Sequence, residues 1–370
     1  MDQVGQKTAL YDTHIALGAK IVSFSDFLMP LQYSGIIDEH NSVRNSVGLF
    51  DLSHMGEFTI SGKDSMSFLQ RMTINDLSRV HVGQAQYSAF CNKLGGIIDD
   101  CVIYRLKDCY LLVVNASNIS KDFNWLLQNL QAEEDVSIKN KSKNYSLLAV
   151  QGPLSLDLLQ RLGKTSEVIG SLPFYHHCFT NIAGVDVICA RTGYTGELGY
   201  ELYIEDSSVK TVWNALMKKG GDLNIQAIGL GARDTLRLEM KYCLYGNDIS
   251  EITNPLEAGL GWITKFEKGN FIGKDKLIEI KSEGIKRKLI GFQVSDKRIA
   301  RNGYKVMRNG KTVGHVTSGS HSPSLLKSIG VAYVKSNCSE IGSNLTIDAR
   351  GRELKATIVR TPFWTKGTSN

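Results

Sequence analysis

The chain contains 370 residues, of which 22% are charged and 42% hydrophobic, which argues against a mainly disordered protein and allows about two or three domains. Its net charge of +6 is mild, and basic residues are interspersed with acidic ones except near residues 281–288, so a nucleic-acid-binding surface is not indicated. No apolar run could span a membrane and residues 1–10 lack a secretory signal, so we expect a cytoplasmic protein of bacterial type or a mature mitochondrial-matrix form.

Apolar periodicity in the first 280 residues predicts helices and strands in mixed order. Strands are expected over 86–92, 97–106, 110–115, 146–150, 185–191 and 200–205. Helices are expected over 64–72, 154–162, 209–218 and 227–239, and from Ser117 or Asn118, as the N-cap, to about residue 130. Because strands and helices do not alternate regularly, this pattern favours an α+β fold.

The composition changes after residue 267. Residues 267–288 are dense in Lys and Glu and predict a surface helix followed by a connector. Six short apolar segments separated by Gly or Asn turns then predict strands over 289–294, 305–308, 312–317, 329–334, 344–348 and 354–359. Strands at such regular spacing suggest a small barrel or sandwich, with a domain boundary near residue 280.

Common cofactor and metal motifs are absent from the sequence. It contains no G-x-x-x-x-G-K-[ST] loop, no complete dinucleotide fingerprint, no H-E-x-x-H pair and no G-x-S-x-G elbow. The seven cysteines are odd in number and none are spaced C-x-x-C, which argues against a disulfide framework and a zinc site and favours a reducing compartment. We therefore expect no metal, ATP or nicotinamide cofactor.

The first candidate for chemistry is the pair Asp99-Asp100 in the strand expected over 97–106. Neighbouring residues on a strand point to opposite faces, so Asp100 is expected on the apolar face of Ile98, Val102 and Tyr104. Burial of a carboxyl group raises its pKa and marks a candidate functional residue, which favours Asp100 over Asp99. Gly95-Gly96 between this strand and the one over 86–92 predicts a hairpin, and the alternative is an aspartate that caps a turn or bulge near it.

The second candidate is the glycine-rich stretch 191–201. Its three glycines allow the backbone to approach another group closely. In the strand that follows, Glu201 and Tyr203 share the face opposite to Tyr200, Leu202 and Ile204. A carboxylate beside an aromatic ring can pair with a planar N–H plus NH₂ edge, as in a guanidinium or a 2-aminopyrimidinone. The alternative is an ordinary solvated strand face.

The third candidate is the helical stretch 232–239, which carries two arginines one turn apart. Asp234 can pair with Arg237 at i,i+3 spacing. Arg233 then lacks a local partner and is available for an anion or a distant carboxylate. The alternative is a network of surface ion pairs.

These stretches belong to a longer series of motifs in the chain. In order they are Asp51-Leu-Ser-His-Met-Gly56, Asn92-Lys-Leu-Gly-Gly-Ile-Ile-Asp-Asp100, Arg191-Thr-Gly-Tyr-Thr-Gly-Glu197, Gly231-Ala-Arg-Asp234, Pro255-Leu-Glu-Ala-Gly-Leu-Gly261 and Thr317-Ser-Gly-Ser320. The series resembles the aminomethyltransferase of the glycine cleavage system, the T-protein family, over nearly the whole chain.

The resemblance implies a three-domain cloverleaf around a central folate pocket. Two interleaved α+β lobes would come from residues 1–280, and a C-terminal β-barrel from residues 281–370. The implied reaction moves the one-carbon unit of an aminomethyl group from the lipoyl arm of a carrier protein, the H-protein, to tetrahydrofolate. The products are 5,10-methylenetetrahydrofolate, ammonia and the dihydrolipoyl carrier, and no nucleic acid or membrane is an expected partner.

The resemblance also implies roles for single residues. Asp100 matches the family's catalytic aspartate, which orients the attacking folate amine and stabilises developing positive charge. Glu201 matches the carboxylate that reads the amino edge of the pterin, and Arg233 matches an arginine of the folate pocket. Further positions that resemble pocket-lining residues are Tyr87, Tyr104, Asn115, Tyr194 and Tyr242.

Some positions depart from the family pattern. Leu198 stands where many relatives carry Asp, which weakens any role for a charge there. The stretch that ends at Arg301 matches only loosely, so Arg301 stays a candidate contact for the lipoyl arm or folate tail. Arg360 has no assigned role, and a basic rim at Lys286–Lys288 is a candidate contact for the carrier.

Two other activities are compatible with the same resemblance. Related folate-linked proteins include demethylases of methylated amines or sulfonium compounds, and a non-catalytic folate-binding repair protein. The repair protein carries a distinctive motif around one cysteine, which is not seen around Cys243 or Cys338. The combination of Asp100, Glu201 and Arg233 favours the transferase.

Overall fold

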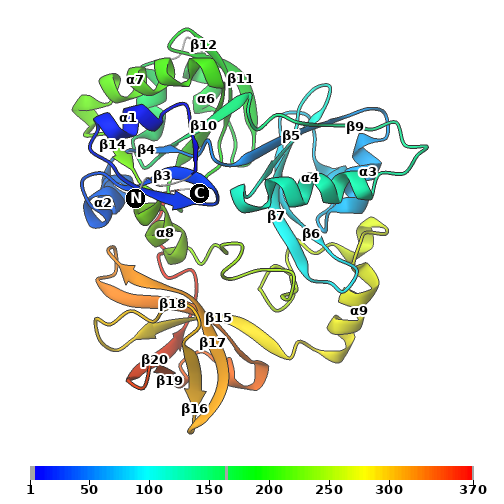
Figure 1. Ribbon diagram of the computed structural model, residues 1–370, viewed down its shortest axis with the longest axis vertical. Coiled ribbons are helices and arrows are strands. Elements are labelled where there is room, and N and C mark those ends of the chain that lie inside the picture. Colours follow the sequence, from blue (N-terminus) through cyan, green and yellow to red (C-terminus); the bar gives the residue numbers. More distant parts are fainter. Residues whose placement is uncertain (1–4, 163–165, 369–370) are drawn as a thin grey trace.

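The computed structural model describes residues 5–162 and 166–368. Two lobes lie side by side, a barrel lies below them, and an irregular segment after α8 crosses the space between the three parts (Figure 1). The helices are α1 (Tyr11–Ala16), α2 (Ile36–Asn45), α3 (Ser65–Met72), α4 (Ile119–Gln128), α5 (Ser155–Gln160), α6 (Ser166–Gly170), α7 (Val209–Lys219), α8 (Leu230–Glu239) and α9 (Lys274–Glu283).

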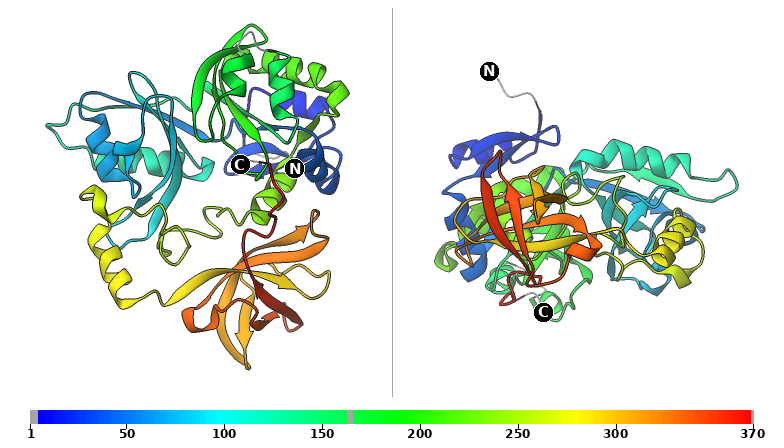
Figure 2. Two further views of the ribbon diagram at one scale, coloured as in Figure 1. Left: turned by 180° about the vertical axis from the view of Figure 1, so that it is seen from behind. Right: turned by 90° about the horizontal axis from the view of Figure 1, so that it is seen from below.

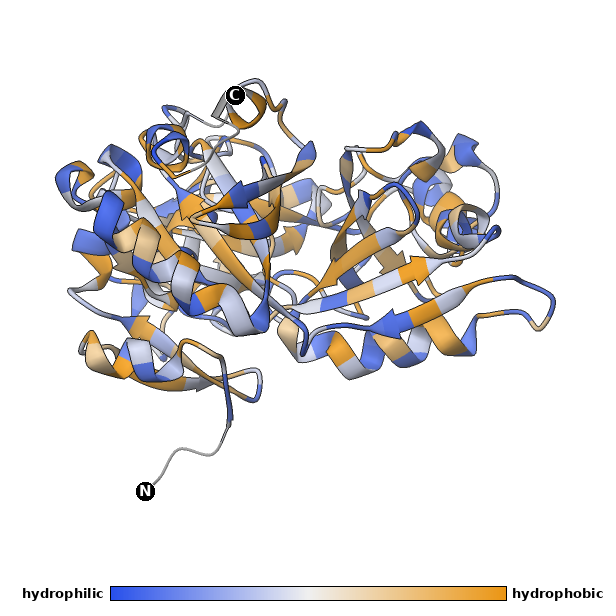
Figure 3. Cartoon of the chain, turned by 90° about the horizontal axis from the view of Figure 1, so that it is seen from above, coloured by the Kyte–Doolittle hydropathy of each residue, from blue (hydrophilic) through white to orange (hydrophobic). Residues whose placement is uncertain are grey.

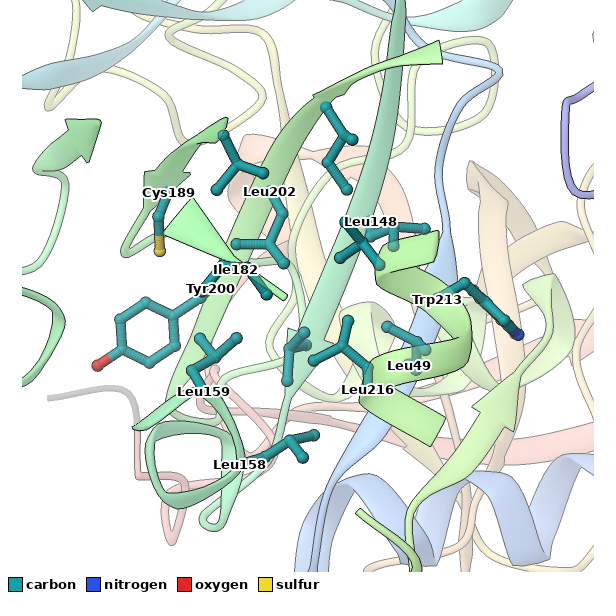
Figure 4. Close-up of a cluster of buried hydrophobic side chains, with 14 of the residues drawn as sticks. Leu49, Leu148, Leu158, Leu159, Ile182, Cys189, Tyr200, Leu202, Trp213 and Leu216 are labelled. Carbon is teal, nitrogen blue, oxygen red and sulfur yellow. The ribbon is translucent and has the colours of Figure 1, made fainter. Parts of the chain in front are cut away.

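The first lobe is built on a six-stranded sheet in the order β11-β12-β13-β10-β4-β14. Its strands are β4 (Gly48–Asp51), β10 (Tyr145–Gln151), β11 (His177–Ile182), β12 (Val185–Ala190), β13 (Gly199–Glu205) and β14 (Gln226–Ile228). Leu49, Leu148 and Leu202 of the sheet pack with Trp213 and Leu216 of α7 in its core (Figure 4). A small sheet of β1 (Gln6–Lys7), β3 (Phe27–Gln32) and β2 (Lys20–Phe24) belongs to the N-terminal segment.

The second lobe is formed by the chain between β4 and β10, so the two lobes interleave in sequence. Its sheet has the order β6-β7-β8-β5-β9. The strands are β5 (Gly56–Ser61), β6 (Ala85–Cys91), β7 (Ile97–Arg105), β8 (Tyr110–Val114) and β9 (Ser137–Asn140). Phe68 of α3 and Leu126 of α4 are fully buried with Phe58 of the sheet, so both helices contribute to its core.

The C-terminal part is a closed barrel in the order β15-β18-β17-β16-β19-β20. Its strands are β15 (Arg287–Val294), β16 (Lys305–Arg308), β17 (Lys311–Ser322), β18 (Lys327–Lys335), β19 (Asn344–Asp348) and β20 (Glu353–Val359). Each contains one of the six predicted segments. The predicted α+β class and C-terminal barrel are confirmed, and of the two alternatives for this part, barrel and sandwich, the structure contains the barrel.

The hydropathy of the strands differs from that of the helices around them. The central strands are largely hydrophobic, whereas the outer helices carry both hydrophobic and hydrophilic residues (Figure 3). Within the described residues, no helix combines the length and the apolar character needed to cross a bilayer.

One local prediction is wrong, and another holds only for the position of the residue. The helix expected over 227–239 begins only at Leu230, because Gln226–Ile228 forms strand β14, which pairs in parallel with β4. Asn118 occupies the N-cap position of α4, but its side chain makes no cap bond and donates instead to Asp99. In both cases a contact with a distant segment overrides the local preference.

A buried ionic cluster around Arg44 of α2 joins segments from all parts of the chain except the second lobe. Its guanidinium donates to Glu197 Oε1 in the glycine-rich stretch at 2.7 Å and to Glu239 Oε2 at the end of α8 at 2.7 Å. Glu239 also accepts from Ser324 Oγ of the barrel at 2.8 Å. The backbone carbonyl of Glu239 accepts from Phe363 N, where the C-terminal tail returns from the barrel to the first lobe (Figure 2).

The charges in this cluster depend on each other. Burial by itself would raise the pKa of Glu239, but the hydrogen bond and charge of His40 and the charge of Arg44 lower it to about 2. Removing one partner of such a pair leaves a buried charge without compensation, which is far more costly than losing an exposed pair.

We therefore expect Arg44→Met to lower the free energy of unfolding by about 3–5 kcal/mol, because Glu197 and Glu239 would stay buried without the Arg44 guanidinium between them. The matched control is Arg161→Met, which also removes an arginine paired with two carboxylates, Asp157 and Asp222, but at the surface. Chemical unfolding monitored by circular dichroism should leave the control close to the wild type. Equal unfolding midpoints for the two variants would contradict a central role for the Arg44 cluster.

Candidate functional site

A β-bulge shapes the strand that carries the Asp99-Asp100 pair. In the β6–β7 ladder Phe90 faces Asp99 and Cys91 faces Ile97, so Ile98 is an extra residue without an opposite partner. Ile98 packs in the second-lobe core with Cys101 and Ile103. The prediction that Asp100 shares a face with Ile98 is therefore wrong, because a bulge breaks the alternation of side chains.

Asp100 nevertheless keeps two of its predicted face neighbours, since Val102 and Tyr104 both pack in the core between the lobes. Its carboxylate accepts from Tyr87 Oη at 2.9 Å and from Asn115 Nδ2 at 2.8 Å. Burial and the neighbouring Asp99 charge raise the pKa of Asp100 to about 7, although these two hydrogen bonds act in the opposite direction. Asp100 can therefore hold or release a proton near neutral pH.

Asp99 is the more deeply buried member of the pair and has no exposed surface. It accepts from the Asn115 backbone N–H at 3.1 Å, from Asn115 Nδ2 at 2.8 Å and from Asn118 Nδ2 at 2.7 Å. Asp99 therefore connects strand β7 to the segment that leads from β8 into α4. The amide of Asn115 contacts both carboxylates and ties them together.

Glu201 lies on β13, at the boundary between the lobes. Tyr203 packs in the core between the lobes, while Tyr200, Leu202 and Ile204 pack in the first-lobe core, as the alternation of the strand predicts. Glu201 Oε2 accepts from Thr192 Oγ1 at 2.5 Å and from Tyr104 Oη of the second lobe at 3.3 Å. Oε1 makes no hydrogen bond within the described part of the chain and is available to another donor.

The glycine-rich stretch approaches the protein's own side chains. A Cβ placed on Gly193 or Gly199 would lie within 2.3 Å of the Gln151 side chain, so any other residue at either position would have to displace that side chain. Gln151 accepts from Thr195 Oγ1 at 2.8 Å and donates to the Thr192 carbonyl at 3.1 Å. These contacts hold Thr192 where it can bond to Glu201.

Arg233, Tyr194 and Tyr242 form a stack beside these carboxylates. The Arg233 guanidinium lies 4.7 Å from the centre of the Tyr194 ring, and the Tyr194 and Tyr242 rings are stacked at 5.5 Å. Tyr194 donates to the Cys243 carbonyl. Asp234 pairs with Arg237, as predicted from their spacing, whereas the side chain of Arg233 makes no hydrogen bond or ion pair with any described residue. Burial lowers the pKa of Arg233, which the charge of Glu201 opposes.

Sequence reasoning missed two aromatic residues of this site. Tyr175 precedes β11 in a left-handed conformation with φ +59°, which is rare for a non-glycine residue. Burial and the charges of Glu201 and Asp100 raise the pKa of its phenol, which places it near both carboxylates. Trp262 stacks on Tyr87 at 6.3 Å and is 64% exposed. No motif marked either residue, because both come from irregular segments.

Other predicted positions lie at the surface. Arg301, Arg360, Lys286 and Lys288 are exposed, and Arg287 between the two lysines forms an ion pair with Glu257.

A cavity of about 810 Å³ lies beside the N-terminal segment and β9, and none of the eight predicted site residues lines it. Within the described ranges, no three His, Cys, Asp or Glu side chains are grouped as metal ligands would be.

Comparison with known proteins identifies relatives over nearly the whole chain. Residues 10–268 match the family described as the GCVT N-terminal domain, and residues 287–364 match the glycine cleavage T-protein C-terminal barrel domain. A protein named aminomethyltransferase from Halothermothrix orenii is 48% identical over 359 residues, which cover 97% of this chain and 99% of that protein. Another from Phocaeicola vulgatus is 47% identical over 360 residues, covering 96% and 99%.

A solved structure agrees with these sequence matches. The crystal structure of glycine cleavage system aminomethyltransferase T from Bartonella henselae matches with a TM-score of 0.91 and 31% sequence identity, covering 98% of this chain and 99% of that one.

The geometry around Asp100 predicts a carboxyl group that titrates with an apparent pKa of about 7, because burial and Asp99 both oppose its ionisation. Carbon NMR of aspartate-labelled protein should show a carboxyl transition near neutral pH that is lost in Asp100→Asn. A spectrum with no transition near neutrality, or one that persists in the variant, would contradict the assignment.

Proposed function

Because this chain belongs to the glycine cleavage T-protein family and is an aminomethyltransferase of the glycine cleavage system, we propose that the side chains around Asp100 and Glu201 hold tetrahydrofolate as the acceptor of its one-carbon unit. The donor would be the aminomethyl group carried as a thioether on the lipoyl arm of the H-protein. Two folate nitrogens, N5 and N10, would each form a bond to the methylene carbon as its bonds to the amino nitrogen and the lipoyl sulfur break. The protons lost from these two nitrogens would pass to the leaving groups, giving ammonia, the dihydrolipoyl thiol and 5,10-methylenetetrahydrofolate.

The observation that carries this proposal is the environment of Asp100. Its carboxyl group is partly buried, has a pKa of about 7 and is oriented by Tyr87 and Asn115. A group that exchanges its proton near the working pH is suited to general acid–base catalysis. As an anion it would also stabilise the positive charge that develops on the one-carbon unit. We assign Asp100 the role of orienting the attacking amine and handling its proton.

The proposed pterin contacts rest on Glu201 and Arg233. Oε2 of Glu201 is occupied by Thr192 and Tyr104, whereas Oε1 is available to accept from the amino edge of a pterin. Arg233 is a cation without an ion-pair partner among the described residues, which supports a contact with an anionic or carbonyl group of the folate. Tyr87, Tyr104, Asn115, Tyr194 and Tyr242 would line or support the same site.

Several finer assignments are part of this proposal. We infer a division near residue 280 between the folate-binding region and the barrel, a cytoplasmic or mitochondrial-matrix location, and a reaction that uses no metal. Exposed Lys286 and Lys288 are candidate contacts for the carrier, although Glu257 compensates Arg287 between them.

The decisive experiment measures methylenetetrahydrofolate formation from the aminomethyl-loaded lipoyl carrier. Activity only with a methylated amine or sulfonium donor would favour a demethylase, and folate binding without turnover a repair protein.

We expect Asp100→Asn to reduce turnover by about 10²–10⁴-fold, because the amide can neither take up a proton nor balance positive charge. Tetrahydrofolate binding, measured by calorimetry, should change little, since the shape of the side chain is kept. Turnover equal to the wild type in a folded variant would remove Asp100 from the mechanism.

For Glu201→Ala we expect weaker tetrahydrofolate binding, by about tenfold or more, because hydrogen bonds to a charged group contribute about 1.5–3 kcal/mol. Glu205→Ala is the matched control, because this glutamate is exposed at the end of the same strand. Binding titrations should separate the two variants. Unchanged affinity in Glu201→Ala would contradict the assignment of the pterin edge.

A further inference from the structure

Asp122 is a buried carboxyl group without a conventional partner. It lies on α4, has no exposed surface, and neither of its carboxyl oxygens meets an N–H or O–H donor within the described residues. Asp122 follows Asn118 by one helical turn, and Asn118 donates to Asp99, so the carboxyl groups of Asp122 and Asp99 lie close enough for a hydrogen bond that needs a proton on one of them. Two carboxylates in contact repel each other strongly, so such a pair must share a proton.

The hydrogen bonds indicate which partner holds the proton. Asp99 accepts from the Asn115 backbone and from the amides of Asn115 and Asn118, which favours its ionised form. Asp122 has no such donors, and burial together with the charge of Asp99 raises its pKa to about 11. Burial raises the pKa of Asp99 as well, but the hydrogen bonds from Asp122, Asn115 and Asn118 act against this effect. The donors around Asp99 and the lack of donors around Asp122 therefore place the shared proton on Asp122 and leave Asp99 as the anion.

This pair is connected to Asp100 through one amide group. Asn115 Nδ2 donates to Asp99 Oδ1 at 2.8 Å and to Asp100 Oδ1 at 2.8 Å. The Asn115 amide directs its two N–H groups at the two carboxyl groups, and this arrangement requires an acceptor oxygen on each of them. The state of Asp99 thus controls the orientation of Asn115 and the negative charge beside Asp100.

We propose that Asp122 is a positioning residue for one-carbon transfer, whose neutral carboxyl group donates to Asp99 and so keeps Asp99 an anion that holds Asn115 against Asp100. The inference rests on the proposed role of Asp100. In this proposal Asp122 does not contact substrate. The buried acid of α4 serves the reaction, and not only the stability of the fold.

The charged groups that face this cluster from neighbouring elements are two cations, Lys121 and Arg233, and the carboxylate of Glu251. Lys121, beside Asp122, directs Nζ to the Ile98 carbonyl and to Tyr245 Oη, 3.5 Å from Glu251. The other titratable groups are phenols and thiols whose pKa is raised by burial: Tyr87, Tyr175, Tyr194, Tyr245, Cys101 and Cys243. None of these changes its charge near neutral pH, so Asp99 is the neighbour whose ionisation can alter the titration of Asp100.

The test compares Asp122→Leu with Asp122→Asn in the full-length protein, using the pH dependence of kcat. Leucine cannot donate a proton, so Asp99 should become protonated and the apparent pKa assigned to Asp100 should fall by about one to two units as the repelling charge is lost. We expect kcat to fall about 10–100-fold, as is typical when a group that orients a functional side chain is removed, with KM for tetrahydrofolate nearly unchanged. Asparagine keeps an N–H donor for Asp99 and should restore both values toward the wild type.

A purely structural role would lower stability without moving the pH profile. An unchanged apparent pKa in Asp122→Leu, or an equal loss in the Leu and Asn variants, would therefore overturn the proposal.

A second readout does not depend on activity or on the folding of the leucine variant. Infrared difference spectra of the wild type minus Asp122→Asn at pH 9, where Asp100 is ionised, should show the C=O band of one protonated carboxyl group. The subtraction is needed because Glu57 is also buried with a raised pKa. Absence of this band would overturn the assignment of Asp122 as the acid. If the band is present but the wild type forms no methylenetetrahydrofolate, the proposed function fails while the proton assignment stands.

Discussion

The cost of burying charge is the constraint on which the rest of this structure depends. Arg44 lies between Glu197 and Glu239, and the serines of the barrel and the C-terminal tail complete the hydrogen bonds of these carboxylates. Because no member of the cluster can be left unpaired at low cost, α2, the glycine-rich stretch, α8 and the barrel must come together. The same contacts fix α8, which carries Arg233 toward Tyr194 and Glu201.

The cost of burying charge also governs the site around Asp100, but there it favours protonated carboxyl groups. Around Arg44 each carboxylate has a cation, and its charge is stabilised. Around Asp100 the described neighbours offer amides, phenols and other carboxyl groups but no ion pair, so protons replace the missing cations. The raised pKa of Asp100 and the acid form of Asp122 both follow from this difference in partners. A cationic one-carbon unit entering such a site would find negative charge that the protein itself does not neutralise.

The two lobes meet at hydrogen bonds rather than at a purely apolar surface. Tyr104 of β7 bonds to Glu201 of β13, and Tyr203 donates to Tyr104 at 3.0 Å. These bonds tie the strand of Asp100 to the strand of Glu201, so any shift between the lobes would move one carboxylate relative to the other. The proposed site for proton handling and the proposed site for the pterin edge are therefore held in one frame.

The sequence by itself determined the elements whose pattern is local: the six barrel strands, the β6–β7 hairpin, the faces of β13, the i,i+3 pair of Asp234 and Arg237, and the order of motifs that indicates the family. It also singled out Asp100, although with a face argument that was partly wrong. Only the tertiary structure decided the bulge at Ile98, strand β14, the use of Asn118 for Asp99 instead of a helix cap, and the places of Tyr175, Trp262 and Asp122. Each of these depends on contacts between segments far apart in the chain, whose free energy exceeds local propensity and leaves no periodic signal in the sequence.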